Sequence, residues 1–406
     1  MQIFFIKLII WCIKKFKTTF AFLKVIKMNF KFLKTLFFVG CLSMISCNEK
    51  DKTQINSNDV NNEIVYATGF ELKHYDTFSV LKVTNPWPNS EQEYTYVLSK
   101  NLDKIPDSLT SYLQIQIPIQ KAVVTSTTHI PSLVELGEEN SLVGFPGLNY
   151  ISNDIIRKKI DAHQIKELDD NENVNLELVL DLQPDVIIGH SYDGENKKLE
   201  NIKNAGLKIV YNGDWVENTP LGKAEWIKFF GALYDKNTEA TTAFNKIVTS
   251  YNDAKNLVNN LPNKPSVLSG SLYQDVWYLP EGESWMAQFI KDAGGNYLWS
   301  DSKGVGSISL GFESVFDKAQ NAQFWIGPGE FTSYDQMQKA NPHYAEFAAF
   351  KNKKVYSYSV KKGASGGTLF YEEAPNRPDL VLKDLIHIFH PNALPNYKPY
   401  FIESLK

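Results

Sequence analysis

The sequence predicts an α/β protein with two similar lobes, and the main evidence for this is a pattern that occurs twice. Residues 177–189 and 313–327 each begin with Glu, carry an apolar pair and then an Asp four residues on, and end with a short apolar run and Gly. This order is typical of a short helix that opens with an acid, followed by a turn and a buried strand. Because the pattern recurs, we expect one carboxylate at an equivalent place in each lobe, and a ligand held between the lobes.

The length and composition favour a folded chain with more than one domain. The 406 residues leave room for two domains, and the hydrophobic share of 43% and aromatic share of 13% are those of a globular protein. The net charge of -4 gives no indication of a nucleic-acid partner. Arg157 and Arg377 are the only arginines, although arginine is the residue best suited to bidentate binding of anions.

Residues 1–47 carry a targeting signal. From Met28, a basic stretch leads into an apolar run of signal-peptide length that ends at Cys47, and charged residues follow. Ile45–Cys47 resembles a bacterial lipobox, in which the cysteine is lipidated and becomes the mature N-terminus. Cys41 is the weaker alternative, because an apolar stretch follows it. We therefore expect a lipoprotein leader over residues 1–47, with Met28 as an alternative start.

A transmembrane anchor is the competing interpretation of the first 27 residues. Four lysines, at positions 14, 15, 17 and 24, interrupt the apolar run well short of the ~18 residues that a span needs. The three cysteines all lie at or before Cys47, so the rest of the chain can hold neither a disulfide nor a thiolate metal site. The leader predicts an envelope protein, lipid-anchored on the periplasmic side or, alternatively, at the cell surface.

The segment after the leader begins with a tether. Residues 48–62 are polar and rich in Asn, as in a flexible linker. Residues 63–120 alternate apolar and polar positions, which predicts a small, β-rich antiparallel N-terminal extension. Its predicted strands are 78–83, 94–98 and 113–117.

Two α/β lobes follow, with helices between them. Residues 121–220 alternate short apolar runs with helical segments, which predicts a parallel sheet covered on both faces. A sustained helical pattern over 221–262 predicts linking helices that form a stiff hinge, and residues 263–406 repeat the α/β pattern. The predicted strands are 122–126, 142–144, 186–188, 208–211, 266–272, 322–327 and 354–358, and the predicted helices are 130–136, 176–182, 195–204, 285–292, 313–319, 335–340 and 378–389.

Taken together, these segments resemble the ABC-transporter substrate-binding proteins of the iron-chelate and cobalamin class. The likeness spans roughly residues 121–391 and lies in the combination and order of its segments rather than in one motif. The segments are 129–137, 142–145, 175–189, 289–296, 312–315 and 377–391. The resemblance implies two Rossmann-like lobes with parallel sheets, joined by one long interdomain helix, with a ligand cleft between the lobes. It also implies a monomer that binds a ligand and catalyses nothing.

The resemblance assigns a partner to the two repeated acids. Glu177 and Glu313 fall where the family places the acids that dock on the ABC permease dimer and pair there with arginines. Charge-assisted bonds between arginine and carboxylate fix orientation, and two of them would align both lobes on a two-fold partner. The simpler interpretation is that each Glu only complements its helix dipole, an effect of about 0.3–1 kcal/mol. Since the two positions match, we favour docking.

Ligands of open α/β lobes lie beyond the carboxyl ends of the strands. The loops at those ends are rich in aromatic residues, as a large planar or apolar ligand requires. From them we select four candidate ligand-binding residues: Tyr150, Tyr192, Trp215 and Trp277.

Other kinds of site find little support in the sequence. The seven histidines are too dispersed for a metal site, and no Ser/His/Asp or paired-acid arrangement indicates catalysis. His129 and His190 are the histidines that could ligate haem iron, but we interpret both as ordinary loop residues. We therefore predict no catalytic residue, no metal ligand and no resident cofactor.

The predicted function is a lipoprotein that captures an iron chelate, either a siderophore or haem, and delivers it to an ABC importer. Scarce arginine counts against a strongly anionic catecholate siderophore. The alternatives are a cobalamin or corrinoid receptor of the same family, and a free-metal-ion receptor or enzyme on the same scaffold. A surface lipoprotein that captures metallophores together with an outer-membrane channel is a further alternative.

Overall fold

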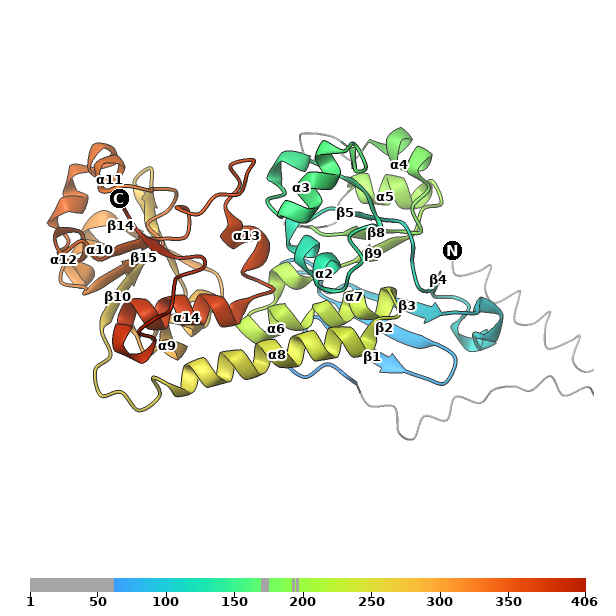
Figure 1. The fold of residues 1–406 in the computed structure, drawn as a ribbon, viewed down its shortest axis with the longest axis horizontal. Coiled ribbons are helices and arrows are strands. Elements are labelled where there is room, and N and C mark those ends of the chain that lie inside the picture. The colour runs from blue at the N-terminus through green and yellow to red at the C-terminus, as the bar shows by residue number, and fades with distance from the viewer. Residues whose placement is uncertain (1–61, 169–174, 192–193, 195–196) are drawn as a thin grey trace, which may run out of the picture. The chain divides into compact units, whose positions relative to one another are not determined.

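The computed structural model describes residues 62–168, 175–191, 194 and 197–406. Within them, two α/β lobes each contain a five-stranded sheet (Figure 1). The sheet of the first lobe is parallel throughout, in the order β7 (Lys166–Glu167), β6 (Leu142–Phe145), β5 (Ala122–Val124), β8 (Val186–Gly189), β9 (Ile209–Tyr211). The sheet of the second lobe has the order β13 (Asn296–Tyr297), β10 (Ser266–Ser269), β15 (Phe324–Ile326), β16 (Val355–Ser357), β17 (Glu403–Ser404), and only β17 is antiparallel.

The repeated sequence pattern occupies the same place in both lobes. In the first lobe, α4 (Leu176–Leu182) leads into β8, which pairs in parallel with β5. In the second lobe, α10 (Phe312–Ala319) leads into β15, which pairs in parallel with β10. The next strand in the sheet is β9 in the first lobe, which pairs in parallel with β8, and β16 in the second lobe, which pairs in parallel with β15. The predicted two-lobed α/β fold, with an acid-opening helix at an equivalent position in each lobe, is therefore confirmed.

The ends of several helices follow directly from the local sequence. The side chain of Asn175 caps α4 by accepting hydrogen bonds from the amides of Glu177 and Leu178, and the Ser284 hydroxyl caps α9 (Trp285–Asp292) by accepting from the amide of Ala287. Gly294, at φ +74°, ends α9, and the amide of Gly295 donates to the Ile290 carbonyl oxygen at 2.8 Å. This is the glycine C-cap that left-handed backbone geometry favours.

The linking segment contains three helices, and the longest of them packs on both lobes. They are α6 (Pro220–Glu225), α7 (Ile227–Leu233) and the 20-residue α8 (Asn237–Asn256). Asp235, at φ +56°, interrupts the helical path before α8, so the sustained pattern in the sequence is broken there. Figure 1 shows α8 running from α7 of the first lobe to α14 (Pro378–Phe389) of the second, and α8 packs on both. The predicted stiff connection is thus formed mainly by α8.

The N-terminal extension is a four-stranded sheet with the order β1 (Phe70–His74), β2 (Ser79–Thr84), β3 (Glu93–Ser99), β4 (Leu113–Gln116). The first three strands are antiparallel, as expected, but β3 and β4 are parallel. The prediction of a wholly antiparallel extension is therefore wrong. The physical reason is the connection between these strands, which passes through two 3₁₀ turns at 102–104 and 107–109 and brings the chain back to the start of β3.

Further elements cover the sheets. The first lobe adds the helices α2 (Ile130–Glu135), α3 (Asp154–Asp161) and α5 (Lys197–Asn204), and the second adds α11 (Tyr334–Ala340), α12 (Ala348–Lys351) and α13 (Leu369–Glu373). A three-stranded antiparallel sheet, β11 (Ser271–Tyr273), β12 (Val276–Pro280) and β14 (Ser307–Gly311), completes the second lobe. One apolar core extends through both lobes, the linking helices and the extension.

A buried carboxylate accepts hydrogen bonds from backbone amides near each end of the described chain. Glu225 of α6 accepts hydrogen bonds from the amides of Val65, Tyr66 and Ala67, and its carboxylate lies 2.9 Å from the Lys228 ammonium group. Asp384 of α14 accepts amide hydrogen bonds from residues 400, 401 and 402 near the C-terminus. Burial raises the pKa of Asp384, while these donors oppose the rise. Each end of the folded body is thus tied to a helix.

Among the described residues, no helix is both long and apolar enough to cross a membrane.

Candidate ligand cleft

The carboxyl ends of the first lobe's strands present a set of loops toward the second lobe. The loop after β5 forms a 3₁₀ turn at 127–129, the loop after β6 contains residues 146–150, and the loop after β9 forms a 3₁₀ turn at 214–216. Contacts with the second lobe come from the turn at 127–129 and from α2, which both touch α13. The strand ends therefore face the space between the lobes, where open α/β folds bind ligands.

Lys223 of α6 joins an aromatic residue of each lobe. Its buried ammonium group donates to the carbonyl oxygens of Asp214 and Trp215, both at 2.9 Å. The same nitrogen lies 6.0 Å from the ring centroid of Trp215 and 5.3 Å from that of Trp285, the first residue of α9 in the second lobe. Burial lowers the pKa of Lys223 to about 8, although the negative charges of Asp214 and Glu217 act to raise it. The lysine thus keeps its proton at neutral pH and carries a cation between two indoles.

The second lobe continues this surface with further aromatic rings. Phe370 stacks on Tyr358 with ring centroids 4.5 Å apart, and Trp285 lies 5.8 Å from Phe370. Tyr371 packs edge-on against Tyr358 at 5.7 Å and remains exposed. Trp215, on the first lobe, leaves 52% of its surface exposed. Each lobe therefore has an exposed aromatic residue in this region, Trp215 in the first lobe and Tyr371 in the second.

A buried polar group lies behind the loop that carries Trp215. Thr128 donates to the Asp214 carboxylate at 2.7 Å, and the Asp214 amide donates to the Asn212 side chain at 2.9 Å. His129 is wholly buried next to them, and within the described residues no hydrogen bond of normal geometry reaches either of its ring nitrogens. Burial lowers the pKa of His129 to about 4, although Asp214 opposes this. The imidazole is therefore neutral at neutral pH.

Hydrogen bonds between the lobes close one side of this region. The buried Glu372 of α13 accepts from the amides of Ser152 and Asn153, and Asn376 donates to the Thr128 carbonyl oxygen at 2.9 Å. Ser365, in the glycine-rich loop 361–367, donates to the Ile151 carbonyl oxygen at 3.1 Å. Burial raises the pKa of Glu372 to about 7, while the two amide donors oppose the rise. The described conformation thus has its lobes in direct contact.

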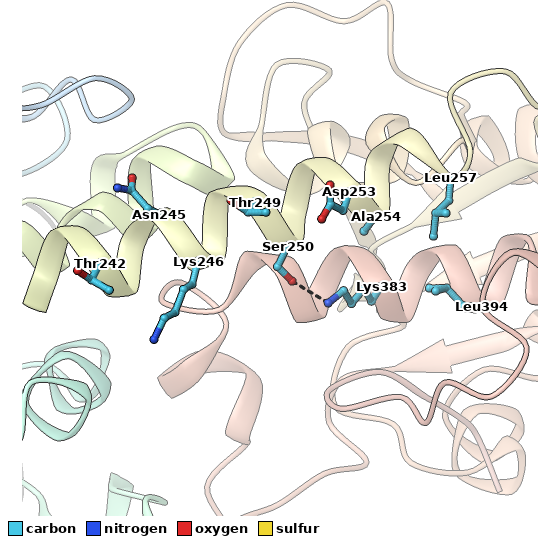
Figure 2. Close-up of a pocket in the computed structure, with 10 residues that line it drawn as sticks. All are labelled: Thr242, Asn245, Lys246, Thr249, Ser250, Asp253, Ala254, Leu257, Lys383 and Leu394. Carbon is cyan, nitrogen blue, oxygen red and sulfur yellow. Dashed lines mark hydrogen bonds between the residues drawn. The ribbon is translucent and has the colours of Figure 1, made fainter.

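Two hollows lie near the linking helices. One, of about 460 Å³, is lined by both lobes and by α6 and α8, and it contains the charged side chains of Glu135, Lys246, Glu373, Arg377 and Asp379. The other, of about 720 Å³, is an open groove between α8 and α14; Figure 2 shows its lining residues, with Lys383 donating to Ser250 at 2.7 Å. The groove contains neither an aromatic side chain nor a strand-end loop, so we do not assign it to the ligand.

The four candidate aromatic residues have different positions. Trp215 and Tyr150 lie at strand ends and are exposed, by 52% and 68% respectively. Tyr192 lies outside the described residues. Trp277 has an exposed fraction of 0% and packs on Trp325 in the core of the second lobe, at 5.2 Å between ring centroids. The assignment of Trp277 to the ligand is corrected accordingly: its indole fills the space between β12 and the helices and offers no surface to a ligand.

The other candidate positions are simpler to describe. Glu177 and Glu313 are both exposed in the first turns of α4 and α10, the equivalent helices of the two lobes. Their side chains are therefore free to meet a partner. Cys47 lies outside the described residues. Within them, no group of three His, Cys, Asp or Glu residues is arranged to hold a metal ion.

Sequence reasoning did not select Lys223, Trp285 or Tyr371. Lys223 lies within a helical pattern, where a lysine is ordinarily exposed. Trp285 directly follows the N-cap residue Ser284, so it lies where a loop ends and α9 begins. This position is a weak sequence signal that could have identified Trp285 as a candidate ligand-binding residue. Tyr371 belongs to the short helix α13, which follows the glycine-rich loop 361–367.

This architecture defines a class of protein: two lobes of matching topology, one long connecting helix, and an aromatic residue of each lobe near Lys223 of the linking helices. These are the features of a two-lobed solute-binding protein. A family model described as periplasmic binding protein matches residues 123–360, more than half of the chain. The chain belongs to this family, whose members of the siderophore, haem and cobalamin type bind substrates and are not enzymes.

One relative by sequence and two solved structures show what the chain is similar to. An uncharacterized lipoprotein of Methanocaldococcus jannaschii is 25% identical over 393 residues, which cover 89% of this chain and 91% of the relative. A periplasmic heme-binding protein of Pseudomonas aeruginosa superimposes with a TM-score of 0.53 at 17% identity, covering 71% of this chain and 98% of that one. A Staphylococcus epidermidis protein, described as a possible iron-binding, periplasmic solute-binding protein, gives 0.53 at 19% identity, covering 67% and 99%. At these identities, the two structures show a shared fold.

Proposed function

We propose that this protein captures an iron chelate between its lobes and delivers it to the permease of an ABC importer. The observation that supports the ligand site best is the meeting of Trp215, Lys223 and Trp285, one residue each from the first lobe, the linking helices and the second lobe. Two indoles around a cation favour a planar or apolar ligand that carries a partial negative charge.

The environment of the arginines narrows the chemical class of the chelate. Arg377 forms a two-point ion pair with Asp379, at 2.9 and 3.0 Å. Arg157 donates to the Leu148 carbonyl oxygen at 2.8 Å and lies 3.9 Å from Asp161. Because both arginines are engaged, neither is available for a highly charged catecholate complex. Haem and a neutral hydroxamate complex fit this surface better, and a corrinoid is the second candidate.

The ligand site can be tested with purified protein comprising residues 48–406. We expect haemin or a ferric trihydroxamate to change its absorption spectrum and quench tryptophan fluorescence on binding, and Trp215→Ala to weaken binding about tenfold or more, as the loss of a buried aromatic contact does. Tyr112→Ala is the matched control, because Tyr112 is also an exposed aromatic residue but belongs to the extension. Cyanocobalamin and free divalent metals are titrated in parallel.

Three outcomes would count against this proposal. Binding of cyanocobalamin alone would favour the corrinoid receptor, and binding of a free metal ion alone would overturn the chelate assignment. Equal affinity of Trp215→Ala and Tyr112→Ala for the bound probe would remove Trp215 from the site.

Delivery requires a second surface, and we assign it to Glu177 and Glu313. Both acids are exposed and open equivalent helices, so a permease with two-fold symmetry could pair one arginine with each. Family members of this type deliver their ligands to ABC permeases, which supports the proposal.

Membrane anchoring through Cys47 is the remaining part of the proposal, and the lipoprotein among the relatives supports it. We expect Cys47→Ser to move the protein from the membrane fraction to the soluble fraction. Mass spectrometry of the wild-type protein should find an acylated N-terminal cysteine at position 47, and Cys41→Ser should leave the fractionation unchanged. Retention of Cys47→Ser in the membrane fraction would remove the lipid anchor from this account.

A further inference from the structure

The N-terminal extension contacts the segment that carries Trp215 at both of its ends. Tyr96 of β3 accepts a hydrogen bond from the amide of Tyr211 through its buried hydroxyl, at 2.9 Å. Tyr211 ends β9, the edge strand of the first lobe's sheet, so this amide would otherwise face no strand. The Tyr211 ring is enclosed by Trp87 and Tyr94, with centroids 5.4 and 4.5 Å away.

The extension also contacts the middle and the far end of the segment. A Cβ atom at Gly213 would come within 3.1 Å of the Pro86 Cα, so the two backbones pass each other closely at this point. At the far end, the buried Glu217 accepts hydrogen bonds from the amides of Thr68 and Gly69 and from the Thr68 hydroxyl, at 2.9, 3.2 and 2.7 Å. Residues 211–217 are thus fixed at three points by the extension, and Trp215 projects from between them.

From these contacts we infer that the extension positions the ligand-binding loop, and that Tyr96 and Trp87 are positioning residues for Trp215. This inference rests on the proposed function only where it uses Trp215 as a ligand contact. A ligand binds more tightly when the binding loop already has its bound conformation in the free protein, because the loop then loses less conformational entropy on binding. Tyr96 lies on β3 and Trp87 lies in the loop between β2 and β3, and both are buried. Neither belongs to a loop of the two lobes, so we assign their effect to the segment 211–217.

The first test needs no ligand. Hydrogen–deuterium exchange of the peptide that covers residues 211–217 is measured in the wild type, Tyr96→Phe, Trp87→Leu and Tyr234→Phe. Tyr234→Phe is the matched control, because it also removes a buried hydroxyl bond, to Ser141 at 2.7 Å, but lies at the end of α7. We expect faster exchange in this peptide for the first two variants alone. Unchanged exchange in Tyr96→Phe and Trp87→Leu would overturn the inference.

The second test asks whether the loop's position controls binding. Haemin and a ferric trihydroxamate are titrated into Tyr96→Phe, Trp215→Ala and the double variant. We expect Tyr96→Phe to weaken binding about tenfold, which corresponds to ~1.4 kcal/mol, and to add nothing in the Trp215→Ala background. Tyr234→Phe should bind like the wild type.

The outcomes separate this inference from the proposed function. If Trp215→Ala weakens binding and Tyr96→Phe does not, the positioning role is wrong and the ligand site stands. If Tyr96→Phe weakens binding equally with and without Trp215, the extension acts by another route and the inference is wrong. If Trp215→Ala leaves binding unchanged, the ligand site fails, whereas the exchange measurement still decides whether the extension holds the loop.

Discussion

Replacing Glu225 by alanine is expected to lower the free energy of unfolding by about 3–5 kcal/mol, the range found when one partner of a buried ion pair is removed. Glu225 is fully buried, and its carboxylate both neutralises Lys228 and accepts three successive backbone amides. The alanine variant leaves the ammonium group of Lys228 with the Glu63 carbonyl oxygen at 3.1 Å, the Glu63 carboxylate at 4.0 Å and the Phe244 ring, whose centroid is 5.1 Å away. It also leaves three amides without acceptors.

Urea denaturation of the purified protein measures this effect. Glu225→Gln keeps the shape of the side chain and part of its hydrogen bonding, so we expect an intermediate loss. Glu71→Ala is the control, because Glu71 pairs with Lys73 on the surface, where ion pairs contribute about 0–1 kcal/mol. A loss for Glu225→Ala no larger than that for Glu71→Ala would show that the buried pair does not hold the extension in place.

The second large effect is expected at the permease. Replacing both Glu177 and Glu313 by alanine should reduce uptake of the bound chelate to the background of a strain without the protein, because both orienting contacts are lost. Each single variant should retain partial uptake. Affinity for haemin or a ferric trihydroxamate in solution should stay at the wild-type value, since Glu177 and Glu313 belong to α4 and α10 and not to the segments that carry Trp215, Lys223 and Trp285.

Glu239→Ala provides the matched control for this experiment. Glu239 is also an exposed first-turn glutamate, of α8, but it is not part of the repeated pattern. It therefore tests the helix-dipole effect of about 0.3–1 kcal/mol without the docking role. Equal uptake by the double variant and Glu239→Ala would contradict the assignment of Glu177 and Glu313 to docking.

Local signals in the sequence were sufficient for much of the fold. The helices α9 and α14 begin and end at the predicted residues, because Ser284 and Pro378 mark their starts and Gly294 follows the end of α9. The matched topology of the lobes was visible in the repeated helix and strand pattern. The parallel pairing of β3 and β4 was not, because the direction of a strand depends on the path of the connection rather than on the strand's own residues.

The candidate site was less accessible to sequence reasoning. Trp277 comes shortly after the polar pair Gln274-Asp275, so it was predicted to be a loop aromatic residue. It is instead part of β12, the central strand of the second sheet of this lobe, and its side chain is fully buried. Lys223 becomes notable only through its neighbours, Trp215 eight residues before it and Trp285 more than 60 residues after it. A meeting of that kind is decided by tertiary packing, which residue periodicity does not encode.

The hydrogen bonds at the start of the described chain determine where mechanical load would enter the molecule. The Asn62 side chain accepts from the Leu72 amide of β1, and the Glu63 carboxylate accepts from Thr241 of α8. Glu225 of α6 then binds the amides of residues 65–67. A force applied at Asn62 would therefore be shared by β1 and the linking helices. In a molecule anchored through Cys47, tension along the chain would load the extension and the hinge region before either five-stranded sheet.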